Sequence, residues 1–211
     1  MRLLVYSDVH GNLPAFEAVL KDSGTVDGSI CLGDLVNYGP WSNECVDLAL
    51  SLTNTIIIRG NHEDAFLNNT YPGSNGLVQE FFNICVQDFE RFNEIEKWGY
   101  DYKREDVNFC HTIGGQKIYE DTPVKLDRNW VIGHSHHQFK LENNGYRLFN
   151  PGSVGQNRKY INVASYMLYD VGSNQMIFKN VKYNVDVVIE KMKASGYPQK
   201  CIGYYSDKQR A

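Results

Sequence analysis

The chain has 211 residues, a net charge of −4 and a pI near 5.9. Hydrophobic residues make up 42% and charged residues 22%, as in a soluble globular protein, and we expect a single domain over residues 1–211. The slightly negative charge gives no positive field to attract nucleic acid, so we do not expect nucleic acid as a partner. No segment is apolar over the length needed to cross a membrane, and the opening apolar run is too short for a signal peptide.

Short apolar runs rich in β-branched and aromatic residues recur along the chain and predict β-strands. We expect eight strands, at residues 3–6, 29–32, 55–58, 107–110, 130–132, 147–149, 165–169 and 176–181. Helical patterns separate the first three runs, which predicts parallel strands with helices outside the sheet. The later runs have shorter connections, which favours an antiparallel portion.

Four segments have the residue spacing of amphipathic helices. The first begins after Asn12, and the second follows Ser42–Asn43, which we expect to cap it. A third amphipathic stretch runs from about residue 77 to residue 92. The fourth covers about residues 185–192 and ends at Gly196, a residue typical of helix ends.

The five cysteines show no CxxC pairing. Cys31 and Cys110 lie within apolar runs, where a free cysteine behaves as a small buried hydrophobe. This usage favours a reducing compartment, and we expect a cytoplasmic protein.

Potential metal ligands directly follow most of the predicted strands. In chain order they are Asp8 and His10, Asp34, Asn61 with His62 and Glu63, His111, and His134 with His136. Ligands of α/β sheets bind beyond the carboxyl ends of the strands, so we expect these side chains to converge in one crevice. Two residues apart on an extended chain, Asp8 and His10 would point to the same side, and the same holds for His134 and His136.

All six histidines of the chain lie just after apolar runs. A single histidine in that position is more often a hydrogen-bonded structural residue than a metal ligand. Five ordered clusters are hard to explain in that way. Imidazoles, carboxylates and an amide oxygen in this number are the ligands that two adjacent divalent ions require.

The motifs Asp8-x-His10, Gly33-Asp34, Gly60-Asn61-His62-Glu63, His111 and Gly133-His134-x-His136 resemble the ordered motif set of the calcineurin-like metallophosphoesterase superfamily. Residues 7–12, 33–40 and 150–158 resemble its compact prokaryotic branch, the YfcE-like phosphodiesterases. The likeness extends from residue 1 to about residue 195. It implies an α/β fold, a four-layer α/β/β/α sandwich with two mixed β-sheets.

The resemblance also implies two divalent metal ions, with Mn²⁺ favoured and Fe, Ni, Zn or Mg as the other candidates. One site takes Asp8, His10 and His136, the second takes Asn61, His111 and His134, and Asp34 bridges the two. A hydroxide between the ions attacks phosphorus of a small phosphorylated substrate, a diester or a monoester. His62, as an imidazolium, then protonates or stabilises the departing oxygen. His137 is expected to point away from the site.

Four further residues have two open interpretations each. Glu63 either fixes the ligand imidazoles or caps the following helix. Asn12, Arg158 and Tyr38 are candidate substrate contacts. Their structural alternatives are a helix cap for Asn12, a surface salt bridge for Arg158 and a packing role for Tyr38.

Two other functions compete with a hydrolase of small phosphate esters. A phosphoprotein phosphatase would carry a longer Arg-bearing motif after Gly33-Asp34, whereas Asn37-Tyr38-Gly39-Pro40 stands there. A non-catalytic scaffold of the same fold would have lost ligands or the acid histidine, and this chain keeps all of them. The sequence leaves a homo-oligomer open, and it gives residues 65–106 no role beyond covering the site.

Overall fold

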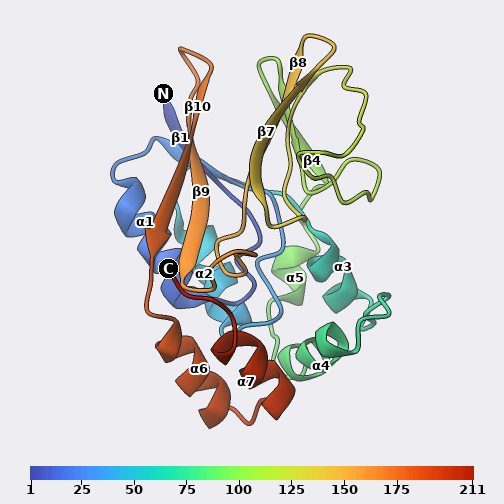
Figure 1. Ribbon diagram of the computed structural model, residues 1–211, viewed down its shortest axis with the longest axis vertical. Coiled ribbons are helices and arrows are strands. Elements are labelled where there is room, and N and C mark those ends of the chain that lie inside the picture. The colour runs from blue at the N-terminus through green and yellow to red at the C-terminus, as the bar shows by residue number, and fades with distance from the viewer.

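The computed structural model describes residues 1–211 and contains two five-stranded β-sheets that pack face to face (Figure 1). The first sheet has the strand order β10-β9-β1-β2-β3. Its strands are β1 (Arg2–Tyr6), β2 (Gly28–Cys31), β3 (Thr55–Ile57), β9 (Val163–Asp170) and β10 (Gln175–Lys182). The first three are parallel, and β9 and β10 extend the sheet antiparallel to their neighbours.

The second sheet has the order β4-β5-β6-β8-β7. Its strands are β4 (Asp101–Arg104), β5 (Val107–Cys110), β6 (Asn129–Val131), β7 (Gln138–Asn143) and β8 (Tyr146–Pro151). The three central strands are parallel and the two edge strands are antiparallel. Both sheets are therefore mixed, as expected.

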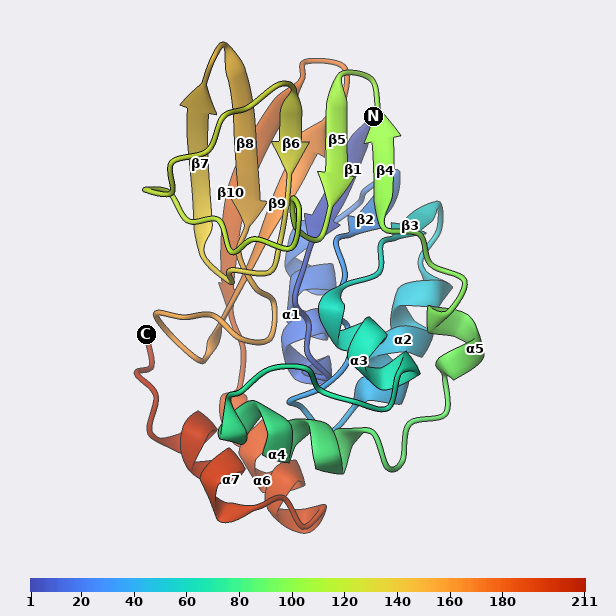
Figure 2. The same cartoon turned by 90° about the vertical axis from the view of Figure 1, so that its right-hand side faces the viewer.

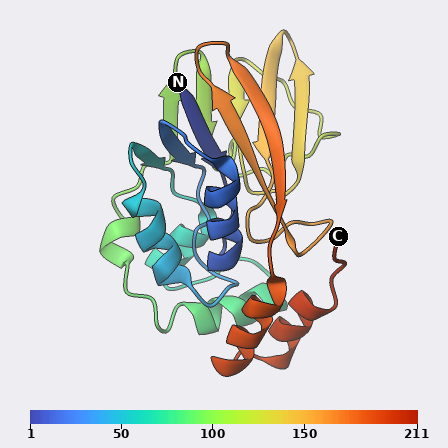
Figure 3. The ribbon, with the colours of Figure 1, turned by 90° about the vertical axis from the view of Figure 1, so that its left-hand side faces the viewer.

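Seven helices flank the sheets and cover one end of the molecule. They are α1 (Leu13–Ser23), α2 (Ser42–Ser51), α3 (Asn61–Leu67), α4 (Gly76–Cys85), α5 (Phe92–Ile95), α6 (Val185–Ala194) and α7 (Gln199–Ser206). Helix α1 lies on the outer face of the first sheet, where it packs on β9 and β10 (Figure 3). Helices α4, α6 and α7 lie below both sheets (Figure 2). None of the seven helices has the length and apolar character of a membrane-spanning segment.

The apolar core is divided by the two sheets. Alternate side chains of β1 lie in different parts of this core, because successive residues of a strand point to opposite faces of the sheet. Leu3 and Val5 pack between the sheets, whereas Leu4 and Tyr6 pack against the helices. The outer face of the second sheet is covered by the irregular segment 111–128, from which Ile118 packs against Phe139 and Leu148.

All eight predicted strands are present, and the structure adds the strands β4 and β7 and the helices α3, α5 and α7. The capping prediction for α2 is wrong, since Trp41 occupies the N-cap position. Ser42 lies inside the helix, and its hydroxyl accepts the Asn37 N–H at 3.1 Å. The amphipathic stretch over residues 77–92 is helical only as far as Cys85, where α4 ends, and the next helix, α5, begins at Phe92. The stripe of α6 ends at Gly196 as predicted, with φ at 72°.

All five cysteines are free and buried, as predicted for Cys31 and Cys110. Burial raises the pKa of the Cys85 thiol to about 12, so this side chain is neutral at physiological pH.

The loop after β8 lies directly on the loop after β1. Val154 N–H donates to the Ser7 carbonyl and Gly155 N–H to the Asp8 carbonyl, both at 3.0 Å. The two backbones approach so closely at Gly155 that a Cβ there would overlap the carbonyl oxygen of Val9. This contact joins the end of the second sheet to the end of the first.

We expect Gly155→Ala to lower the free energy of unfolding by about 3 kcal/mol, because backbone atoms surround the added methyl group and cannot move aside cheaply. Urea unfolding followed by circular dichroism measures this change. Gly76→Ala is the matched control, since open space surrounds Gly76 at the start of α4, and it should leave stability unchanged or raise it by up to about 1 kcal/mol. Equal stabilities of the two variants would contradict the close approach.

Candidate metal centre

The loops after the strands carry unusual backbone conformations where the predicted ligands stand. Asp8, His10, Asp34, His134 and His136 all have positive φ, between 52° and 68°. Such left-handed residues cost free energy and concentrate at functional sites. We predicted that Asp8 and His10, like His134 and His136, point to the same side because the chain is extended there. That reason is wrong, because the backbone at these residues is not extended. Tight turns, rather than strand alternation, direct these side chains.

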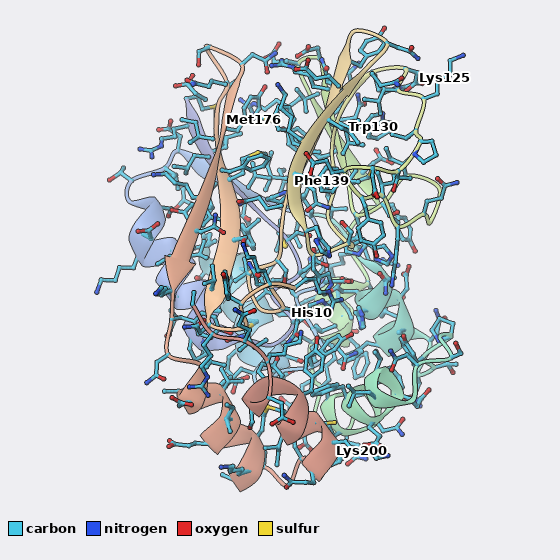
Figure 4. All side chains as sticks on the ribbon, viewed as in Figure 1. His10, Lys125, Trp130, Phe139, Met176 and Lys200 are labelled. Carbon is cyan, nitrogen blue, oxygen red and sulfur yellow. The ribbon has the colours of Figure 1, made fainter.

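The first group of ligand atoms comes from the loops after β1 and β6. Asp8 Oδ1 lies 3.8 Å from His10 Nε2 and 3.2 Å from His136 Nε2. The two imidazole Nε2 atoms are themselves 3.2 Å apart. All three side chains are buried, at 5% exposure or less, and Figure 4 locates His10 in the interior between the strands and the lower helices.

The second group comes from the loops after β2, β3, β5 and β6. His111 Nε2 lies at its centre, 3.1 Å from Asp34 Oδ2, 3.1 Å from Asn61 Oδ1 and 3.2 Å from His134 Nδ1. Three further positions that were predicted from the sequence thus meet around one imidazole nitrogen. His137 belongs to neither group, and its exposed ring packs edge-on against Tyr119 at 5.4 Å.

Asp34 connects the two groups. Its Oδ2 atom lies 3.1 Å from His111 Nε2 and 4.0 Å from His10 Nε2. Its Oδ1 atom accepts the backbone N–H of His62 at 2.9 Å. One oxygen of a single buried carboxylate therefore faces the imidazoles of both groups.

Backbone carbonyls orient three of the imidazoles. His10 Nδ1 donates to Val36 O at 3.1 Å, His111 Nδ1 to Leu32 O at 2.8 Å, and His136 Nδ1 to the Gln156 carbonyl at 3.2 Å. With Nδ1 acting as the donor, the lone pair of each neutral ring lies on Nε2 and points into the cluster. Sequence reasoning missed these partners, because a main-chain acceptor leaves no side-chain signal.

Glu63 contacts no imidazole. Its carboxylate accepts backbone N–H groups from Asp34 at 2.9 Å, Leu35 at 2.7 Å and Gly60 at 2.8 Å. The Gly60 bond closes the N-terminus of α3, so the capping interpretation is correct and the imidazole-fixing one is wrong. The same carboxylate also ties the Asp34 loop to that helix.

His62 faces the cluster from the start of α3. Its Nε2 lies 4.0 Å from Asp34 Oδ2, and its Nδ1 lies 2.8 Å from Asn37 Nδ2. The Asn37 Oδ1 accepts the Tyr38 N–H at 2.8 Å, which turns the amide NH₂ group toward His62. Nδ1 is then an acceptor, and the proton of the neutral ring lies on Nε2. Asn37 was not predicted as a site residue. In the sequence, only its position in the polar turn after Asp34 points to such a role.

The candidate substrate contacts separate into three cases. Asn12 is fully buried, caps α1 through the Ala15 N–H and donates to Tyr183, which supports the helix-cap interpretation. Tyr38 is 6% exposed and its ring packs 4.7 Å from that of His10. Arg158 is exposed and makes no ion pair, contrary to the salt-bridge alternative; it donates to the Tyr204 hydroxyl at 3.0 Å.

In the absence of metal, charge in the cluster is concentrated on one ion pair. Burial opposes a charge on His111, but the Asp34 carboxylate overrides burial and raises the pKa of His111 to about 10. Burial, assisted by the positive charge of His111, lowers the pKa of His134 to about 4. Burial likewise lowers the pKa of His10. At neutral pH His111 is thus protonated, and the other two rings are neutral.

This arrangement of donors fits divalent cations. The lone pairs of His10 and His136 face each other, and Asp8 Oδ1 is buried without a hydrogen-bond donor. A cation between these atoms would satisfy all three at once. Metal–ligand bonds of about 2.1 Å separate neighbouring ligand atoms by about 3.0–3.4 Å, which matches the 3.1–3.2 Å contacts of both groups.

The sequence and the fold were compared with those of known proteins. Residues 1–189 match the family described as calcineurin-like phosphoesterase. An uncharacterized protein of Methanocaldococcus jannaschii is 29% identical over an alignment of 229 positions. The alignment covers 93% of this chain and 94% of that protein.

Solved structures share the architecture. A metallophosphoesterase from Sphaerobacter thermophilus superposes with a TM-score of 0.79 at 27% identity, over 98% of this chain and 99% of the other. YfcE, a phosphoesterase from E. coli, has the same fold, with a TM-score of 0.52 at 22% identity over 87% of this chain and 100% of its own. With 189 of its 211 residues matched, the chain belongs to the calcineurin-like phosphoesterase family and is a metallophosphoesterase.

Proposed function

We propose that this enzyme hydrolyses a phosphoester bond of a small phosphorylated molecule with two divalent metal ions. The observation that carries this proposal is Asp34 Oδ2, which faces the imidazoles of both ligand groups. One ion would be held by the first group and the other by the second, with Asp34 shared. The ligands would be Asp8, His10 and His136 for the first ion, and Asn61, His111 and His134 for the second.

The metal pair, with Mn²⁺ as the first candidate, supplies Lewis acidity toward phosphate oxygens and lowers the pKa of water toward neutrality. The chain supplies the geometry. The carbonyls behind His10, His111 and His136 hold the ligand nitrogens in place before metal binds. Buried surroundings strengthen each electrostatic contact with a bound phosphate.

His62 is proposed to act on the substrate oxygen from outside the metal ligands. Its Nε2 points toward Asp34, while Asn37 occupies its Nδ1. An imidazolium would lose the Asn37 bond, and burial lowers the pKa of His62. We therefore revise the imidazolium of the sequence-based mechanism. A neutral ring that donates its Nε2–H to a phosphate oxygen or to the departing oxygen fits the contacts better.

Turnover with added metal tests the proposal directly. Purified chain with Mn²⁺ should hydrolyse bis(4-nitrophenyl) phosphate or 4-nitrophenyl phosphate, followed as nitrophenolate release. Asp34→Asn should abolish turnover and lower metal content from two ions per chain to fewer than one, because both groups lose a ligand. Asp121→Asn, at an exposed carboxylate, is the control and should keep both. Absence of turnover with Mn, Fe, Ni, Zn and Mg would refute the proposal.

His62→Ala should lower kcat by about 100-fold or more while metal content stays at two ions per chain. The reason is that His62 belongs to neither proposed set of ligands and acts on the substrate alone. Mass spectrometry of bound metal, run beside the nitrophenolate assay, measures both quantities. His137→Ala provides the control, since its exposed ring lies outside both groups. Parallel loss of metal and activity in His62→Ala would show that the role assigned to His62 is wrong.

Metal binding should release about one proton per chain at pH 7.5. His111, with its pKa near 10, is protonated in the metal-free chain and must be neutral to bind metal. Apparent affinity should therefore rise by about tenfold per pH unit between pH 7 and pH 9. Calorimetric titrations in buffers of different ionisation enthalpy count the proton, and His111→Gln should release about one fewer. Proton-neutral binding to the unmodified chain would contradict this assignment.

A further inference from the structure

Two cationic side chains converge on one neutral hydroxyl beside the metal centre. Arg158 Nη1 donates to the Tyr204 hydroxyl at 3.0 Å, and Lys208 Nζ donates to the same oxygen at 2.6 Å. Arg158 comes from the loop after β8, Tyr204 from helix α7, and Lys208 from the C-terminal segment. Residues from three different parts of the chain thus form a single cluster. We call its two cations, Arg158 and Lys208, the cation pair.

The backbone holds these two cations together. The C-terminal segment runs back along the loop after β8, where Ile161 N–H donates to the Gln209 carbonyl at 2.9 Å and Ala211 N–H donates to Asn162 Oδ1 at 2.8 Å. Lys208 precedes the first of these contacts, and Arg158 lies three residues before Ile161. The approach of the two cations is therefore built into the fold and does not depend on two freely mobile side chains.

The cation pair has no negative partner within the chain. No carboxylate oxygen lies within 4.0 Å of Arg158 or Lys208, whereas other surface cations such as Arg91 and Arg210 are paired. The guanidinium and the ammonium contact the same oxygen atom, so their like charges repel each other. Burial, together with the charge of Arg158, lowers the pKa of Lys208 to about 8. An anion beside the pair would remove this repulsion.

The hydroxyl of Tyr204 has a donor to spare. A phenol oxygen offers two acceptor positions and one O–H. Arg158 and Lys208 occupy the acceptor positions, so the O–H group remains available as a donor. An anion placed at the cation pair would therefore meet donors from a guanidinium, an ammonium and a hydroxyl. Several donors converging on one position are typical of phosphate recognition by Arg and Lys.

The cation pair lies close to the proposed metal site. The Tyr204 ring is 6.2 Å from that of Tyr38, and the Tyr38 ring is 4.7 Å from that of His10, between ring centroids. Arg158 also lines a cavity of about 470 Å³ together with the metal-ligand candidate His136. Arg158 therefore borders both the proposed metal site and Tyr204, so a second phosphate of a substrate held at the metals would meet Arg158 first.

We propose that Arg158, Lys208 and the Tyr204 hydroxyl bind a second phosphate group of the substrate, one that the enzyme does not cleave. This inference rests on the proposed hydrolase function and narrows its substrate class. The preferred substrates would be phosphoesters that carry a further phosphate beside the scissile one, such as nucleoside bisphosphate esters. Lys208 and Tyr204 become specificity-determining residues contributed by the C-terminal part of the chain.

A matched pair of substrates tests the proposal. Thymidine 5′-(4-nitrophenyl phosphate) and its 3′-phosphorylated derivative release the same nitrophenolate and differ by one phosphate. With Mn²⁺, kcat/KM should be at least about tenfold higher for the 3′-phosphorylated ester, the effect of one added charge-assisted contact. If both esters are cleaved equally well, the second phosphate site is overturned and the hydrolase function stands. If neither is cleaved although 4-nitrophenyl phosphate or bis(4-nitrophenyl) phosphate is, the second phosphate site is overturned and the hydrolase function stands. If no ester is cleaved with any of the metals, both proposals fall.

Variants separate recognition from a structural role of the cation pair. Arg158→Ala and Lys208→Ala should each reduce the preference between the two esters at least about tenfold, and Lys208→Arg should restore it. Lys193→Ala is the control, because Lys193 is an exposed cation of α6 that does not line the cavity beside Arg158, and it should keep the preference of the unmodified chain. A preference that survives both alanine substitutions would overturn the site, since the cations would then serve only to fasten the C-terminal segment.

Discussion

The Asp34 carboxylate is the charge on which both groups of the candidate metal centre depend. It is 1% exposed, and an isolated buried carboxylate would be strongly destabilising. The protonated His111 ring offsets its charge in the metal-free chain, and a cation would take over that task on binding. Four backbone N–H groups around Glu63 keep the Asp34 loop against α3. The position of one oxygen atom thus rests on a second, neighbouring carboxylate.

The convergence of the candidate ligands was predictable because each member directly follows a strand and belongs to an ordered motif. The backbone conformation that positions these side chains was not predictable, since the residues around Asp8 and His134 give no indication of a left-handed backbone. For Glu63 and Asn12, a sequence pattern allows both a cap and a contact with the site. Only the tertiary hydrogen bonds decide between them, and they decide for the cap in both cases.

Contacts made by long-range approach were also beyond the reach of the sequence. Asn37 meets His62 across 25 positions, and Arg158 meets Tyr204 across 46. Helix α7 itself was not predicted, although it supplies Tyr204. Strands such as β1, β2 and β9 were easier, because their apolar runs are buried on both faces and leave little choice of conformation. Edge strand β4 was missed for the opposite reason, since its sequence Asp-Tyr-Lys-Arg is polar and half exposed.

The main-chain acceptors behind the imidazoles have a consequence for how this enzyme can evolve. Because carbonyl oxygens of Leu32, Val36 and Gln156 orient the rings, substitution of those residues leaves the acceptor in place. The geometry of the ligands is thereby insulated from drift in the residues around them. A metallophosphoesterase with 27% identity shares the architecture over nearly the whole chain. An imidazole oriented by a main-chain carbonyl can keep its orientation while the side chains around it are substituted.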